Sequence, residues 1–132
     1  MKRICILLLT VLLLLVGCSK ADKASVTVES ILEVFDWPSH YTQEYNRDVI
    51  DEIQNRLTPE NDINRIIHIV DQNTAPPNLE WVYVYEFVGE KDAVDFEENR
   101  TQYVKTVENG KCVRYGKIVV YGNSELINSI GG

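Results

Sequence analysis

The residue in this chain with the most evident chemistry is Cys18, a thiol that follows a long apolar segment. Two basic residues come after the initiating methionine, and thirteen almost entirely apolar residues then run from Ile4 to Val16. Gly17 stands between this segment and Cys18. A thiolate is a strong nucleophile, and a glycine beside it leaves room for a peptidase to reach the backbone. The spacing therefore predicts that the chain is cut just before Cys18.

The order of basic residues, apolar segment, small residue and cysteine is that of an export signal. Within it, Leu15-Val16-Gly17-Cys18 resembles the lipobox of bacterial lipoproteins. The resemblance implies that the Cys18 thiol receives a diacylglycerol and that the signal peptide, residues 1–17, is then removed. A helix that spans a bilayer needs ~20 apolar residues, so thirteen argue against a retained transmembrane helix. An ordinary secretory signal remains the alternative.

Lipid on Cys18 would hold the protein at a membrane of the cell envelope, on the side that faces away from the cytoplasm. Each buried methylene contributes ~0.8 kcal/mol, so two or three acyl chains hold a protein firmly. Residues 18–25 are small and polar and predict a flexible tether of ~15 Å. The remaining residues, 26–132, are enough for one domain. The sequence leaves open whether the membrane is the cell membrane or an outer membrane.

The charge of the chain restricts its partners. The formal net charge is −7, and removal of residues 1–17 takes away Lys2 and Arg3 but no acid, which leaves −9. Such a surface would be repelled by nucleic acid and by anionic lipid head groups. We therefore expect no nucleic-acid partner, and contact with the membrane through the lipid alone.

Cysteine usage predicts a domain without an internal disulfide. Cys5 would leave with the signal and Cys18 would carry lipid, so Cys112 would be the remaining thiol. No histidine lies near Cys112 in the sequence to act as its base, although folding could bring one close. A packed or half-buried thiol is expected there rather than a reactive one.

Hydrophobic periodicity predicts helices and strands in the exported domain. Thr27 is expected to cap a first helix that ends before Trp37-Pro38, and 39–46 is expected to be a loop with aromatic anchors. The remaining expected helices are Arg47–Leu57, a helix that starts near Glu90 and ends at Asn109-Gly110, and a short helix from Asn123. The expected strands are Trp81–Val88, Cys112–Tyr115 and Lys117–Tyr121, with Gly116 as the hinge between the last two.

The sequence of Arg65–Val70 is compatible with either a helix or a strand. Ile63, Ile66, Ile67 and Val70 fall at helical spacing after Thr58-Pro59. The density of β-branched residues and the turn that follows at 71–78 favour a strand. With that strand the pattern predicts an α+β fold, one small and mainly antiparallel sheet with helices packed on one face.

The most distinctive row of side chains lies on one face of the Trp81–Val88 strand. Its members are aromatic: Trp81, Tyr83, Tyr85 and Phe87. The apolar helices need a sheet face to cover, which favours a core role for the row. The alternative is an exposed platform that binds a peptide, a glycan or a partner protein of the envelope.

Catalytic and metal-binding patterns are weak. Glycine-rich phosphate loops and serine-hydrolase motifs are absent from the sequence, and the acidic residues 92–98 are expected on a solvated helix face. His40 and His68 are the two histidines. The sequence therefore predicts a non-catalytic, membrane-anchored binding or envelope-interaction module without a metal or cofactor. The alternative is a small exported hydrolase-like enzyme that uses His40 or His68 with carboxylates.

Overall fold

Five antiparallel strands form a single sheet, and helices pack against it. The computed structural model describes residues 26–36 and 38–130, so the predicted signal peptide, Cys18 and the whole tether lie outside the described residues. The strand order across the sheet is β1-β2-β3-β5-β4. The elements follow the chain in the order α2 (Val28–Val34), β1 (His40–Glu44), α3 (Arg47–Leu57), β2 (Ile63–Asp71), β3 (Trp81–Phe87), α4 (Glu90–Val104), β4 (Gly110–Tyr115), β5 (Ile118–Asn123) and α5 (Ser124–Asn128).

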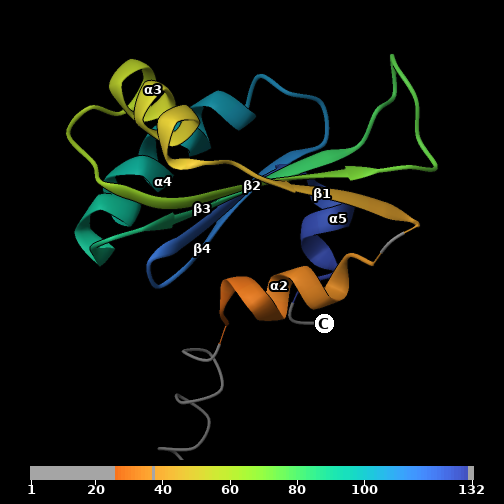
Figure 1. The fold of residues 1–132 in the computed structure, drawn as a ribbon. Helices are drawn as coiled ribbons and strands as arrows, with labels where there is room; N and C mark the ends of the chain where they lie inside the picture. The colour runs from red at the N-terminus through yellow and green to blue at the C-terminus, as the bar shows by residue number, and fades with distance from the viewer. Residues whose placement is uncertain (1–25, 37, 131–132) are drawn as a thin grey trace, which may run out of the picture.

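The expected α+β fold is confirmed, but the helices cover both faces of the sheet rather than one. Figure 1 shows α3 and α4 on one side of the strands and α2 and α5 on the other. The central strands carry apolar side chains at consecutive positions, such as Ile66 with Ile67 and Val119 with Val120. Because neighbouring strand residues point to opposite faces, both faces need cover from water.

The face under α2 and α5 has an aliphatic core. Val28 and Ile31 of α2 and Ile127 of α5 are buried here. The strand residues beneath them are Ile67, Ile69, Val82, Val84, Ile118 and Val120. Burial of an aliphatic side chain of this size stabilises a fold by about 1.5–3 kcal/mol, so this layer ties the first and last helices to the sheet.

The face under α3 and α4 has an aromatic core. Ile50 of α3 and Ala93, Phe96 and Val104 of α4 are buried on it. The strand residues beneath them are Ile63, Ile66, Tyr85, Phe87, Val119 and Tyr121. The large rings therefore lie on the side of the sheet that carries the longer helices.

The helix starts follow the capping chemistry of the sequence. Thr27 caps α2, where its hydroxyl accepts a hydrogen bond from the Ser30 amide at 3.1 Å and the Ser30 hydroxyl accepts one from the Thr27 amide at 2.9 Å. Asn46 caps α3 and Asn123 caps α5 through a side-chain oxygen that accepts hydrogen bonds from backbone amides of the first turn. A side chain that accepts from the first free amides of a helix fixes where the helix begins.

Arg65–Val70 is a strand, as the β-branched residues favoured, and it forms the middle of β2. The expected loop at 39–46 is wrong, because His40–Glu44 form the edge strand β1 and pair with β2 from His40–Asp71 to Glu44–Ile67. This strand was missed because four of its five residues are exposed. An edge strand without an apolar alternation gives no periodic signal.

The last two strands form a hairpin around Gly116, whose φ of 59° lies in the left-handed region that favours glycine. None of the helices in the described part of the chain is long and apolar enough to cross a membrane.

Candidate functional site

The aromatic row of β3 is divided between the core and the surface. Tyr85 and Phe87 are 2% and 1% exposed, and Phe96 of α4 packs on both, with ring centroids 4.7 and 5.0 Å away. Tyr85 and Phe87 therefore have the core role that the sequence favoured, and not the alternative role in an exposed platform. They are buried because α4 lies over this end of the strand.

Trp81 and Tyr83 are half-buried, because they lie toward the start of β3. His68 of β2 stacks on Tyr83 with ring centroids 4.3 Å apart and planes 6° apart. Tyr121 of β5 stacks on Tyr83 at 5.7 Å and 24°. Since β2 and β5 flank β3 on opposite sides, both faces of the Tyr83 ring are occupied. Only the edge and the hydroxyl of the Tyr83 ring therefore remain available for contact with a ligand.

The Tyr83 hydroxyl is a hydrogen-bond donor at neutral pH. Burial raises the pKa of Tyr83 above its ordinary value, and a hydrogen bond with Tyr45 raises it further. A phenol in this environment keeps its proton, because the charged form would lose its solvation.

Trp81 differs from Tyr83 because its neighbours meet it at steep angles. Its ring is tilted 67° from Tyr83 and 88° from Tyr121, at centroid distances of 5.5 and 6.1 Å. Edge contacts of this kind do not cover the indole as parallel stacking would. The rest of the half-buried indole borders a cleft.

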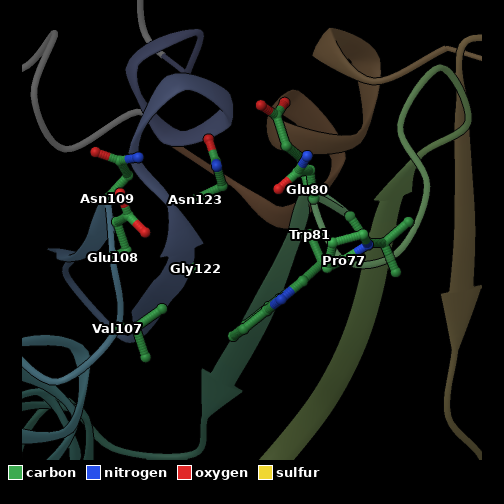
Figure 2. Close-up of a pocket in the computed structure, with 10 residues that line it drawn as sticks. Pro77, Glu80, Trp81, Val107, Glu108, Asn109, Gly122 and Asn123 are labelled. Carbon is green, nitrogen blue, oxygen red and sulfur yellow. The ribbon is translucent and has the colours of Figure 1, made fainter.

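The cleft has a volume of about 480 Å³ and lies at one end of the sheet. The β2–β3 loop and the start of β3 form one wall, and the α4–β4 loop and the end of β5 form the other. Figure 2 shows Glu108 and Asn109 on one side of the opening and Glu80 and Trp81 on the other. The full lining is Pro77, Asn78, Leu79, Glu80, Trp81, Val107, Glu108, Asn109, Gly122 and Asn123.

The lining contains acids and amides but no basic residue. Asn123 is engaged in the cap of α5, where its side-chain oxygen accepts from the Glu125 amide at 2.9 Å. Within 26–36 and 38–130, no hydrogen bond or ion pair engages the side chains of Glu80 or Glu108. Their carboxylates are therefore free to accept hydrogen bonds from a ligand.

Gly122 of β5 lies where the backbones of the two cleft walls are in close contact. A Cβ at this position would lie 2.3 Å from the carbonyl oxygen of Trp81, and the Gly122 φ of 146° is one that other residues rarely adopt. Glycine allows the two backbones to approach this closely. Trp81 thus depends on Gly122 for its position in the cleft.

Arg100 of α4 lies over three rings of the aromatic face. Its guanidinium carbon lies 5.1 to 5.8 Å from the ring centroids of Phe96, Tyr103 and Tyr121. A cation over aromatic rings contributes roughly 0.5–2 kcal/mol. Arg100 thus helps to keep Tyr121 buried beside Tyr83.

The two histidines lie on opposite faces of the sheet. His68 stacks on the Tyr83 side, whereas His40 meets Phe35 on the α2 side, with ring centroids 5.1 Å apart. The register pairs His68 with Gln43, three residues from His40. A site that uses both histidines is therefore excluded. Within the described residues, no hydrogen bond or ion pair joins either histidine to a carboxylate.

Cys112 is half-buried, as expected, and lies in β4 beside the aromatic core. Burial raises the pKa of its thiol, which lowers the fraction of reactive thiolate. Over the described ranges, no group of three or more histidine, cysteine or acidic residues could hold a metal ion.

A second hollow, of about 330 Å³, lies between the α3–β2 loop and α4. The one aromatic residue in its lining is Phe96, which is 1% exposed. This hollow offers a ligand no open ring, so the first cleft is the stronger candidate site.

Comparison of the chain with protein-family models, curated proteins and solved structures finds no match. The candidate site therefore rests on its own geometry. Sequence reasoning identified Trp81 but missed the other residues that line the cleft, and Tyr83, which it also named, lies beside the cleft rather than in its lining. The turns at 71–78 and Asn109-Gly110 were visible in the sequence, but only the strand order brings them to the same end of the sheet.

Proposed function

We propose that this protein is a non-catalytic binding module, held at a membrane of the cell envelope by lipid on Cys18. The signal sequence that ends in Leu15-Val16-Gly17-Cys18 supports the anchor. The cleft beside the half-buried Trp81 supports the binding role and is the observation that carries the proposal. A concave site with an aromatic wall and a few polar groups is the usual form of a ligand site.

The position of the cleft suits a tethered receptor. The tether leads into α2, which lies on the opposite face of the sheet from α4 (Figure 1). One wall of the cleft is the loop that follows α4. A tether that reaches the domain on the α2 side leaves this wall turned away from the point of attachment. A ligand could then enter the cleft without displacing the anchor.

The anchor is tested by cell fractionation. The wild-type chain is expected in the membrane fraction with labelled fatty acid on it, and Cys18→Ser is expected to carry no lipid and to keep residues 1–17, because the cut follows lipidation. Release of the wild-type chain by high salt would show that charge, rather than lipid, holds the chain, and fatty-acid labelling of Cys18→Ser equal to that of the wild type would contradict the anchor.

The binding role is tested with envelope extract separated into glycan, lipid and protein fractions. At least one fraction should bind the purified full chain, and Trp81→Leu should abolish the binding without lowering the melting temperature by more than a few degrees. Tyr103→Leu is the matched control, because Tyr103 is 45% exposed on α4 and does not line the cleft. The proposed site would be rejected if Trp81→Leu and Tyr103→Leu lost the same amount of binding. It would also be rejected if no envelope fraction bound either the wild-type chain or Tyr103→Leu.

A further inference from the structure

We infer that the cleft beside Trp81 binds a saccharide, with a sugar ring packed on the indole and its hydroxyls hydrogen-bonded by the acids and amides of the two walls. This inference rests on the proposed binding function and names the class of ligand.

The indole offers the apolar part of such a site. Trp81 is the one aromatic residue in the cleft lining, and its half-buried ring is held by edge contacts from Tyr83 and Tyr121. The face of a pyranose ring carries several C–H groups, which pack on an aromatic surface as other apolar groups do. Figure 2 shows the Trp81 side chain extending from the start of β3 across the base of the opening.

The polar groups fit a ligand that both donates and accepts hydrogen bonds. Glu80 and Glu108 accept only, whereas the amides of Asn78 and Asn109 can donate and accept. Within the part of the chain that the structure describes, no hydrogen bond engages these four side chains. Neighbouring hydroxyls of a sugar are matched to such a set, because each hydroxyl donates one hydrogen bond and accepts others.

The size and composition of the cleft favour a sugar over a cation. Its volume of about 480 Å³ lies within the ~300–1,000 Å³ of pockets that hold small molecules. An ammonium group would use the two carboxylates and the indole but would leave both amides and most of the volume unused. A saccharide uses the whole lining.

The test uses the full chain, purified from membranes in detergent, with Trp37→Phe so that Trp81 is the remaining tryptophan of the two in the sequence. The probes are chitotriose, cellotriose, maltotriose and tetralysine. At least one trisaccharide should change the Trp81 fluorescence in a saturable way and give heat in calorimetry. Tetralysine should do neither.

Conservative variants separate hydrogen bonding from charge. The double variant Glu80→Gln with Glu108→Gln keeps polar groups of the same shape without the charge, so sugar affinity should fall by less than in the alanine double variant, because an amide still forms hydrogen bonds, although weaker ones than a carboxylate. Glu80→Ala with Glu108→Ala should weaken it by roughly tenfold or more, about 1.4 kcal/mol. Glu98→Gln, on the exposed surface of α4, is the control.

Three results overturn the inference. One is the absence of a response to any trisaccharide while envelope fractions still bind through Trp81, in which case the binding function stands and the ligand class is wrong. Another is tetralysine binding that the glutamine variants abolish, which would identify a cation site. The third is a sugar affinity that Trp81→Leu leaves unchanged. Failure of the Trp81-dependent envelope binding described above would instead reject the binding function itself.

Discussion

The imidazole of His68 lies almost parallel to the phenol ring of Tyr83, with 4.3 Å between the ring centroids. This cross-strand pair marks the boundary between the covered part of the sheet under α4 and the open part beside Trp81. Its burial has a measurable electrostatic consequence.

His68 should titrate below the ordinary histidine pKa of 6.5, because burial disfavours its charged form. Below pH 6.5 the unfolded chain then binds more protons than the folded chain. The contribution of neutral His68 to the free energy of unfolding is therefore fully present above pH 6.5 and is lost as the pH falls through the folded-state pKa. NMR titration of His68 gives the pKa directly. His68→Phe should flatten the fall in stability below about pH 6.5, and an unshifted pKa would contradict the burial of His68.

Phe96→Ala should be strongly destabilising. Phe96 is 1% exposed and packs on both Tyr85 and Phe87, so its loss leaves a cavity that costs about 3–5 kcal/mol. Urea denaturation measures the change. Val88→Ala is the control, because Val88 is 60% exposed and should change stability by at most about 0.5 kcal/mol. Similar costs for the two variants would be inconsistent with α4 covering this end of β3.

Gly116 and Gly122, the two glycines with positive φ among the described residues, should respond differently to alanine. Gly122→Ala places a Cβ 2.3 Å from the Trp81 carbonyl oxygen, so strand β5 must shift at a cost of about 3 kcal/mol or more. Gly116→Ala meets no atom within 4 Å and should cost only the left-handed backbone, about 1–2 kcal/mol. Thermal denaturation of both variants checks the order, and a reversed order would contradict the pairing of β3 with β5.

Cys112 should react slowly while the domain is folded. Burial raises the pKa of its thiol, and partial cover limits access, so alkylation by iodoacetamide should be at least roughly tenfold slower in buffer than in urea. Mass spectrometry of the peptide that contains Cys112 follows the reaction. Equal rates in the two conditions would mean that the thiol is exposed.

The sequence predicted the elements whose own residues specify them. Arg47–Leu57 has the apolar spacing and the Asn46 cap of a helix, and Trp81–Phe87 has the alternation of a strand, so local patterns located both. His40–Glu44 was missed because its strand structure comes from pairing with β2 rather than from its own side chains. The apolar residues at consecutive positions of β2 and β5 could have indicated a sheet covered on both faces.

The site was predictable only in part, for the same reason. Trp81 and Tyr83 stand out as aromatic residues on one strand face, but their exposure depends on where α4 ends relative to β3. Glu80 and Glu108 are separated by a strand and a helix in the chain and meet across the cleft through the tertiary fold. No local pattern encodes such a meeting.

The most direct test of the tethered role is the intact mass and the N-terminal peptide mass of the protein isolated from its native membrane. We predict a chain that begins at Cys18 and carries a diacylglyceryl group on the sulfur. A chain that still carries residues 1–17, or a Cys18 with a free thiol, would contradict the anchor and with it the proposed membrane-held receptor.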